Sequence, residues 1–300
     1  MSRPRAGYIG FNRVPAATAL NSAASGVWTL REAEALKRAG TWPVDETQAF
    51  IDASGITDST QKAALQTLVS DLKSSGVWGK LLAIYPFVGG TSSSHKYNLK
   101  DARDTDGAYR LTFTGTWTHG STGATPSGAW ADTFLNPSIV FASNTYSLGI
   151  YLRTNPASAS SYRVDMGCAV QLNNANGRFY SHIVSGDGNS YFDFRSRLTV
   201  SNTTYGSATA FHVISRETTS SLKVFNNGTL KDTNTSGSDT YPVPDRSVWL
   251  GANNNNDTNA RNASNREISF AFLGNALTES QVSDLSDAVA DFQVTLGRNV

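Results

Sequence analysis

The sequence has little charge, few glutamates and a single cysteine. Charged residues make up 16% of its 300 positions, the net charge is +1, and glutamate occurs only six times. This balance gives no reason to expect binding to nucleic acid or to an anionic membrane. Cys168 alone cannot form an internal disulfide or a cysteine-based zinc site. Because it alternates with Val164, Met166 and Val170, we expect a small buried hydrophobe.

Long apolar runs and the known catalytic motifs are also missing. No stretch reaches the length of a membrane span, and the first twenty residues lack the apolar core of a secretion signal. There is no G-x-S-x-G, H-E-x-x-H, phosphate-binding loop or dinucleotide fingerprint. Before the final helix, the β region contains only Glu217 and Glu267, which do not form the closely spaced carboxylate pair of a retaining glycosidase. We therefore expect no enzyme and no cofactor.

Two groups of polar residues are candidate metal ligands, and for both the simpler explanation is favoured. Asp101, Asp104 and Asp106 precede Gly107 but lack the further carboxylates of a calcium loop, so Asx turns are the favoured interpretation. The four histidines are scattered and fit surface or turn positions: His95, His119, His182 and His212. We expect no bound metal.

Alternating apolar residues dominate the chain from residue 80 onward. Leu148, Ile150 and Leu152 form one such run, and 268–273 forms another that is typical of a half-buried strand. Asn227-Gly228 predicts a tight hairpin turn, since both residues tolerate positive φ. The pattern predicts a mainly β fold: a two-sheet antiparallel jelly-roll sandwich over 80–276, of roughly ten to twelve strands, with a small N-terminal helical segment and a C-terminal helix.

Helical periodicity occurs at both ends of this β region. A helix is predicted over 57–75, where Asp58 and Gln61 have capping-box spacing, and a shorter one over 46–53, within a helical segment 25–79. A final helix within 277–300 should be capped by Thr278 and Gln281. Its apolar residues follow at intervals of three and four, which fits packing on its own domain or a seam between subunits: Val282, Leu285, Val289, Phe292 and Leu296.

Residues 1–24 show neither helical nor strand periodicity. They contain arginines without acidic partners, which fits a disordered terminus or an extended arm that lies on a partner subunit. The apolar residues fit the second interpretation, because a solvated tail does not need them, and the sequence leaves both interpretations open. The candidate subunit contacts in the N-terminal part are Tyr8, Ile9, Phe11, Arg13, Trp28 and Trp42.

Several stretches resemble one family of tailed-phage virion proteins: SGVWTLREAEALKRAGTWP at 25–43, the stretch 76–124 that begins GVWGKLLAIYPFVGG, ISFAFLGNALTESQVSDL at 268–285, and DFQVTLGR at 291–298. The stretch 248–276, together with the hairpin SLKVFNNGTLKD that precedes it, also resembles the closing half of a concanavalin-A-like, or laminin-G-like, jelly roll, in which the last strand lies beside the first. The resemblance implies a structural component of a virion, such as a fibre, appendage or decoration protein. It would bind other virion proteins through its N-terminal region, form a homo-oligomer and project a lectin-like sandwich.

Sugar binding is the alternative function, directed at glycans of the host surface. We expect it in two polar loops, 118–133 and 252–265, because an indole stacks on a pyranose while amides bind its hydroxyls. A tryptophan at the edge of the core and asparagines in left-handed turns would explain the same residues without a ligand. The candidate glycan contacts are Trp117, His119, Trp130, Asn253, Asn254, Asn255, Asn256 and Asp257.

Overall fold

The computed structural model describes residues 45–141, 145–156, 163–169, 178–182, 188–194, 197–235, 243–255 and 260–300. The expected arm at 1–24, Trp28, Trp42, Asn256 and Asp257 lie outside these residues. Contacts divide the chain into two units, 1–49 and 50–300. All the strands of the described part belong to the second unit.

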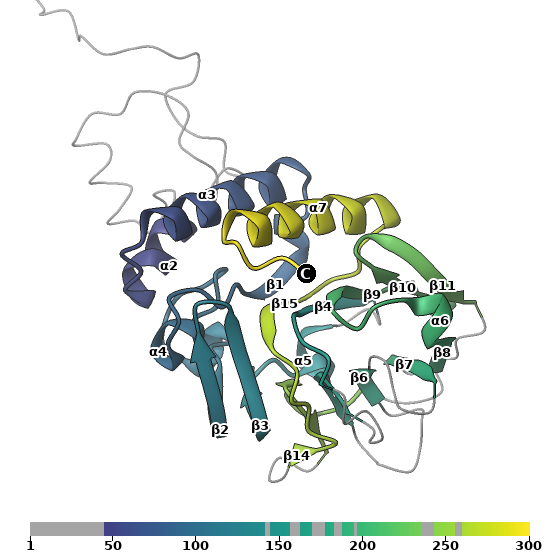
Figure 1. The fold of residues 1–300 in the computed structure, drawn as a ribbon. Coiled ribbons are helices and arrows are strands. Elements are labelled where there is room, and N and C mark those ends of the chain that lie inside the picture. The colour runs from purple at the N-terminus through teal and green to yellow at the C-terminus, as the bar shows by residue number, and fades with distance from the viewer. Residues whose placement is uncertain are drawn as a thin grey trace, which may run out of the picture. The chain divides into compact units, whose positions relative to one another are not determined.

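Helices occur at both ends of the described chain, and strands fill the middle (Figure 1). The helices are α2 (Glu46–Ser54), α3 (Ser59–Ser74), α4 (Ser92–His95), α5 (Pro137–Val140), α6 (Asn202–Tyr205) and α7 (Glu279–Thr295). The longer strands are β1 (Leu81–Tyr85), β2 (Thr112–Gly120), β3 (Gly123–Asp132), β4 (Tyr146–Leu152), β5 (Met166–Ala169), β6 (Arg178–His182), β7 (Asn189–Phe194), β8 (Arg197–Ser201), β9 (Ala210–Thr218), β10 (Ser221–Asn226), β11 (Thr229–Asn234) and β15 (Ile268–Gly274). The two-residue strands are β12 (Trp249–Leu250), β13 (Asn253–Asn254) and β14 (Ala260–Arg261). No helix among them is long and apolar enough to cross a membrane.

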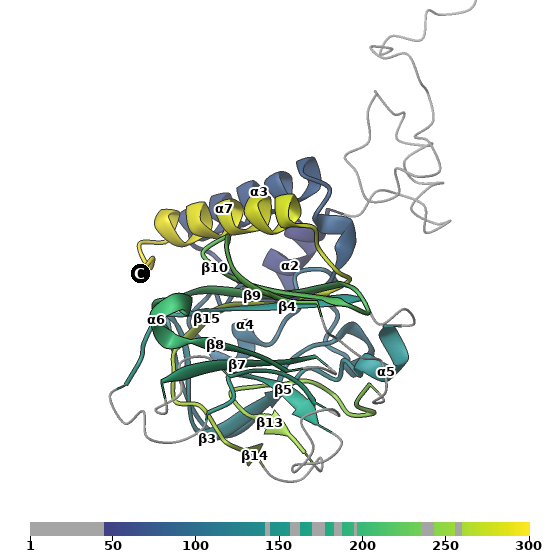
Figure 2. The same cartoon turned by 90° about the vertical axis from the view of Figure 1, so that its right-hand side faces the viewer.

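The strands form a jelly-roll sandwich, as the sequence predicts. Their order is β11-β10-β9-β4-β15-β3-β12-β5-β6-β7-β8, with β1 on β15 and β2 on β3. Strand β15 lies between β4 and β3 and pairs with both. It pairs with β4 along most of its length but with β3 only at Ile268 and Ala124. The sheet therefore bends at this point into two layers. Figure 2 shows β9, β4 and β15 in one layer and β8, β7 and β5 in the other. Named strands pair antiparallel except β13 and β5.

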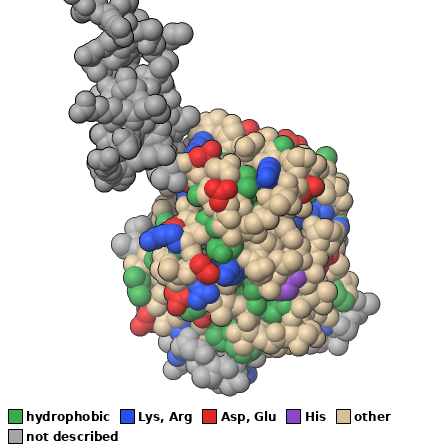
Figure 3. Space-filling view, turned by 90° about the vertical axis from the view of Figure 1, so that its left-hand side faces the viewer, with side chains coloured by type: hydrophobic (Ala, Val, Ile, Leu, Met, Phe, Trp, Pro, Cys, Tyr) green, Lys and Arg blue, Asp and Glu red, His purple; other side chains and the backbone are tan. Residues whose placement is uncertain are grey.

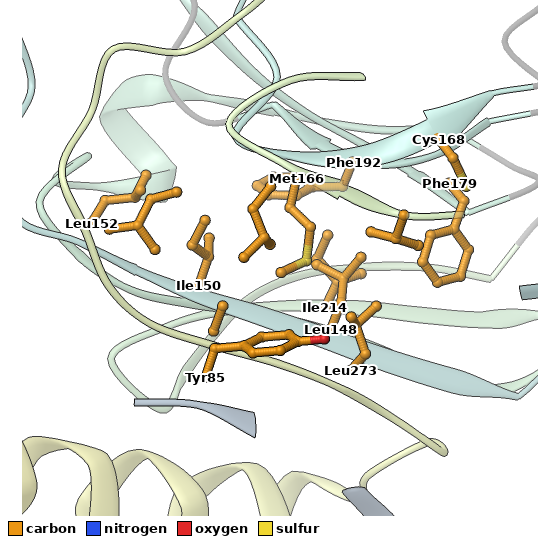
Figure 4. Close-up of a cluster of buried hydrophobic side chains, with 14 of the residues drawn as sticks. Tyr85, Leu148, Ile150, Leu152, Met166, Cys168, Phe179, Phe192, Ile214 and Leu273 are labelled. Carbon is orange, nitrogen blue, oxygen red and sulfur yellow. The ribbon is translucent and has the colours of Figure 1, made fainter. Parts of the chain in front are cut away.

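The first core lies between the two layers. In Figure 4, Leu148, Ile150 and Ile214 of one layer point toward side chains of the other layer, which include Met166, Cys168, Phe179 and Phe192. Cys168 is fully buried, as its position in the alternating pattern predicts. These contacts confirm that the alternating residues of the β region face a core between two sheets.

A second core lies on the opposite face of the first layer, under helices α3 and α7 (Figures 1 and 2). Phe211, Phe270 and Phe272 of the sheet are buried in it. The helices contribute Ala64, Leu65, Leu68, Val69, Leu72, Val282, Leu285, Val289 and Phe292, all buried. The layer that contains β15 is therefore covered on both faces.

The second core corrects two expectations. Val282, Leu285, Val289 and Phe292 cannot be subunit contacts, because their side chains are buried against the chain's own sheet, and Leu296 packs on the same cluster. Residues 50–79 are not separate from the sandwich either, since they share this core and belong to the unit 50–300. The expected boundary at residue 79 is therefore wrong.

Strand β15 pairs with β1, as expected, with Ile84 opposite Phe272. It is buried along its whole length, however, and not on one face only. A register shift between Ile268 and Phe270 places Ile268 in the core between the sheets, whereas Phe270 and Phe272 face the helices. The extra residue of a β-bulge changes which face a side chain occupies, which simple alternation does not show.

Local signals at turns and caps are mostly confirmed. Thr278 and Gln281 form a complete capping box at α7. At α3, Asp58 accepts the backbone N–H of Gln61, but the Gln61 side chain accepts from the Gly89 N–H instead of returning to the cap. A tertiary contact has thus replaced half of the predicted box.

The β10–β11 hairpin turns at Asn227-Gly228 with φ of 46° and 74°. This is the pair of positive angles that the sequence predicts for a tight hairpin turn.

Candidate functional site

The stretch expected as a polar loop at 118–133 is mostly the β2–β3 hairpin. The strands pair from Thr112–Asp132 to Gly120–Gly123, so only two residues form the turn. A bulge in β3 interrupts the ladder here, because Gly128 and Ala129 lie opposite Gly115 alone, and the two glycines have φ of 64° and 82°. The abundance of Gly, Ser and Thr in this stretch indicated a loop. In the structure, however, the glycines adopt the positive φ angles of the bulge, and the threonines are strand residues, which β-branched side chains favour.

Three half-buried rings lie together on this hairpin. Phe113 and Trp117 meet edge to face with centroids 5.2 Å apart, and Phe113 meets His119 in the same way at 4.7 Å. The rings of Trp117 and His119 are 6.2 Å apart and inclined by 27°. We call Phe113, Trp117 and His119 the aromatic–histidine surface. Figure 3, seen from the side on which β2 and β3 lie in Figure 1, shows a histidine beside hydrophobic side chains.

His95 is a buried residue that contacts His119 of this surface. It ends α4, a short helix that begins with a capping box between Thr91 and Ser94. Its side chain is 1% exposed, and its Nδ1 lies 3.0 Å from Nδ1 of His119. Burial lowers the pKa of His95 to about 3, with further contributions from His119 and the charge of Arg298. Burial also lowers the pKa of His119, so both rings are neutral at pH 7.

The backbone is strained at Phe87, whose ring contacts that of His95. Phe87 has φ of 47°, which a bulky residue adopts only when the surroundings impose it, and its ring meets that of His95 at 5.3 Å. The buried guanidinium of Arg298 donates to the carbonyls of Phe87 and Pro86, both at 2.7 Å. Gln293 accepts from the same guanidinium at 2.6 Å. Arg298 of the C-terminal segment therefore fixes the backbone of Pro86 and Phe87, and the ring of Phe87 contacts His95.

Trp130 lies away from this surface, contrary to the expected single platform. Trp130 pairs with Thr114 in the hairpin and therefore lies on the same face of the sheet as Thr114. The next residue, Phe113, points to the other face, where it contacts Trp117. The two tryptophans therefore occupy opposite faces. The Trp130 ring stacks on that of buried Trp249, with centroids 4.7 Å apart. Its link to Trp117 is through the backbone, since Trp117 Nε1 donates to the Trp130 carbonyl.

The asparagine-rich stretch does not offer the expected row of amides. Asn253 and Asn254 form β13, which is buried between β5 and β14. The Asn254 amide donates to the Ser247 carbonyl. The two residues are therefore structural, and their assignment to a glycan site is wrong. Asn255 is half-buried and its side-chain oxygen is enclosed without a partner.

The acidic residues near the hairpin are neutralised by cations. The carboxylate of Asp101 accepts the backbone N–H of Arg103, which confirms an Asx turn, and also pairs with its guanidinium. Asp104 pairs with Lys96 and Arg110, and Asp106 pairs with Arg110. Across the residues that the structure describes, no three His, Cys, Asp or Glu side chains gather as metal ligands.

A polar cleft of about 370 Å³ lies elsewhere on the molecule, near the start of α7. It is lined by Lys80, Thr145, Glu217, Asn275, Ala276, Thr278 and Gln281 and has no aromatic side chain. Thr278 and Gln281 already serve the helix cap, and Glu217 is paired with Lys223. These engaged side chains make the cleft a weaker candidate than the aromatic–histidine surface.

The sequence matches no protein-family model, and no curated protein matches it either. Solved structures do resemble the fold. Domain 4 of the arabinanase AbnA from Geobacillus stearothermophilus, in complex with arabinotriose, is 20% identical, with 69% of this chain and 98% of that chain covered and a TM-score of 0.47. The binding domain of botulinum neurotoxin serotype D/C is 15% identical, with 71% and 53% covered and a TM-score of 0.50. The NanB sialidase from Streptococcus pneumoniae is 12% identical, with 57% and 27% covered and a TM-score of 0.40.

This chain thus spans about half the length of the neurotoxin binding domain that it matches. At such low identity the likeness shows the fold and nothing of the ligand. The fold is a jelly-roll sandwich.

Sequence reasoning identified two of the three residues of the aromatic–histidine surface. Trp117 and His119 were expected as ligand contacts, and Phe113 was not. His95 was interpreted as a surface or turn residue, which is wrong because it is buried. It is 24 residues from His119 along the chain, and no pattern links the two. Only the packing of α4 under the hairpin brings them together.

Proposed function

We propose that this protein is a non-enzymatic glycan-binding sandwich and that a sugar stacks on its aromatic–histidine surface. The observation that carries the proposal is the group of three half-buried rings on a braced hairpin. Aromatic faces suit the apolar face of a pyranose, and neutral imidazole adds a polar group that can bond a hydroxyl. In this role Trp117 keeps its hydrogen bond to the Trp130 carbonyl, and His119 keeps its contact with His95.

Rigidity supports this role. Phe113 holds both Trp117 and His119 by edge-to-face contacts, and His95 holds His119 from behind. Side chains that are fixed before binding lose little conformational entropy when a ligand arrives. A shallow surface of this size still binds a single sugar weakly, so useful affinity requires several copies acting together.

The state of the two glutamates of the β region supports a function without catalysis. Glu217 is paired with Lys223 at 2.8 Å. Glu267 is paired with Arg153 at 2.8 Å and accepts from the Thr122 hydroxyl. A retaining or inverting glycosidase needs two carboxyl groups that face one substrate bond. Each of these carboxylates is instead engaged with its own cation.

The test is binding of an oligomeric form of the protein to a glycan array, with two tryptophan variants. Trp117→Ala removes a ring of the proposed surface and should abolish the signal. Trp130→Ala is the matched control, because it removes the same side chain from the opposite face of the same hairpin, and it should keep the signal. Binding that survives Trp117→Ala, or no binding by the unchanged protein, would contradict the proposal.

We also propose that the sandwich is carried on a virion as a fibre, appendage or decoration component. The support is the sequence resemblance at 25–43, 76–124, 268–285 and 291–298 to tailed-phage virion proteins. The division of contacts at residue 49 fits a self-contained sandwich preceded by a segment of separate function. In this proposal residues 1–49 attach to other virion proteins and the host glycan is met by the sandwich. Loss of particle incorporation on deletion of residues 1–44 is the expected result.

A further inference from the structure

The contact between His95 and His119 has room for only one hydrogen. Both Nδ1 atoms face each other at 3.0 Å, which is an ordinary distance for an N–H···N hydrogen bond. A neutral imidazole carries hydrogen on one nitrogen and a lone pair on the other. One ring must therefore donate from Nδ1 while the other accepts at Nδ1.

The surroundings of His95 decide which ring donates. Its Nε2 is buried without a hydrogen-bond partner. If Nδ1 of His95 were the acceptor, its hydrogen would be on Nε2, which would bury an unsatisfied N–H group. In native structures, buried N–H donors without a partner are rarer than buried acceptors that are not fully satisfied. The lower-energy arrangement has the hydrogen of His95 on Nδ1.

His119 must then accept at Nδ1 and carry its hydrogen on Nε2. This nitrogen bonds none of the described residues, and it is not among their enclosed polar atoms without a partner. The ring is half-buried and its outer edge is accessible beside Trp117. A single N–H group is therefore available to a ligand at the aromatic–histidine surface.

We propose that His95 is a positioning residue that fixes the tautomer of His119, so that the surface presents an Nε2–H donor beside Trp117 to an acceptor oxygen of the sugar. The tautomer is inferred from the contact between His95 and His119, whereas its use in binding a sugar rests on the proposed function. A neutral donor of this kind selects a hydroxyl or ring oxygen. Specificity at this position then depends on where the sugar carries its acceptor relative to the face that stacks on Trp117.

The charges around His95 keep the arrangement intact. Burial is the main factor that opposes a second proton on His95 and so lowers its pKa, and the coulombic effects of His119 from β2 and of Arg298 from the C-terminal segment act in the same direction. Phe87, which contacts it from the loop after β1, is uncharged. His95 therefore takes up no second proton over the pH range in which the pKa of an ordinary histidine lies.

The tautomer can be read directly by long-range proton–nitrogen NMR of the full chain with nitrogen-15 in its histidines. We expect His119 to show a protonated Nε2 with a bare Nδ1, and His95 to show a protonated Nδ1. His212 is an internal reference, because Nε2 lies against the Ala208 carbonyl and Nδ1 against the Tyr205 hydroxyl, which fixes hydrogen on Nε2. Hydrogen on Nδ1 of His119, or an even mixture of its tautomers, would overturn the inference.

Two variants separate positioning from mere packing. His95→Asn keeps an N–H donor near the place of Nδ1, so His119 should retain hydrogen on Nε2. His95→Leu removes the donor, so His119 should become a mixture of tautomers. If the protein binds a glycan, His95→Leu should weaken the binding about twofold, because an even mixture of tautomers leaves the Nε2–H form in half of the molecules, and His95→Asn should restore most of the loss. Equal spectra for the two variants would argue against positioning.

The outcomes also distinguish this inference from the proposed function. A fixed Nε2–H tautomer without any glycan binding contradicts the function and leaves the positioning role intact. Glycan binding with hydrogen on Nδ1 of His119 contradicts the positioning role and leaves the function intact. The spectrum of the unchanged protein decides the inference by itself, even if a variant does not fold.

Discussion

At Gly149 in β4 the backbone has room for a hydrogen and for nothing larger. A Cβ there would lie 2.3 Å from Cε1 of Phe272 and 2.9 Å from the His212 carbonyl oxygen. Gly149→Ala should therefore cost about 1–3 kcal/mol of stability, as overpacking of a dense core does. Gly79→Ala is the control, because nothing lies within 4 Å of its added methyl. Urea unfolding measures both, and equal midpoints for the two variants would contradict the tight packing.

Two buried histidines should make stability depend on pH. His95 and His212 are buried in the folded state, where their pKa values fall to about 3 mainly by burial. The unfolded chain takes up protons near pH 6.5, so between about pH 6.5 and 3 it binds more protons than the folded chain, and stability falls as pH is lowered through this window. Each histidine should cost about 2 kcal/mol between pH 7 and pH 5.

Chemical denaturation at pH 7 and at pH 5, with His212→Gln beside the unchanged protein, checks this expectation. The variant should lose about half of the histidine contribution to the pH dependence, whatever its stability at pH 7. An unchanged difference between the two pH values would show that His212 is not buried as a neutral ring.

At the scale of elements, α7 is the clearest case in which one pattern fits two structures. Leu285 is fully buried in the second core, whereas Val294 on the same helix is 59% exposed. Leu285→Ala should cost about 2–5 kcal/mol, and Val294→Ala should stay within about 0.5 kcal/mol. Denaturant unfolding gives both values, while light scattering reports the oligomeric state, which neither change should alter. If Leu285→Ala changed the oligomeric state with little loss of stability, the result would support α7 as a contact between subunits.

Helices α3 and α7 were predictable because their apolar residues repeat at three and four and their caps are local. The pairing of β15 with β1 was expected from the family resemblance and is confirmed. The hairpin at 112–132 was only partly expected, since its bulge and glycines look like a loop in the sequence. The covering of β15 on its second face was not expected, because it depends on which helices return to the sheet.

For the whole molecule, both cores lie within 50–300, so a shortened chain that starts at Asp45 should fold alone. Its thermal midpoint should agree with that of the full chain to within a few degrees, since the shortened chain keeps every described residue of both cores. Calorimetry of the two chains measures this. A large loss of stability, or no cooperative transition in the shortened chain, would show that the first 44 residues belong to the folding unit.

Periodicity, caps and turn residues determined the mainly β fold, the two long helices and the tight turn at Asn227-Gly228, because these follow from interactions between residues close along the chain. Only the tertiary structure decided what those elements cover. It buried Val282 and Leu285 against the chain's own sheet, moved Trp130 to the opposite face from Trp117, and placed His95 under His119. Such contacts join residues distant in sequence, where no local spacing records which surfaces will meet.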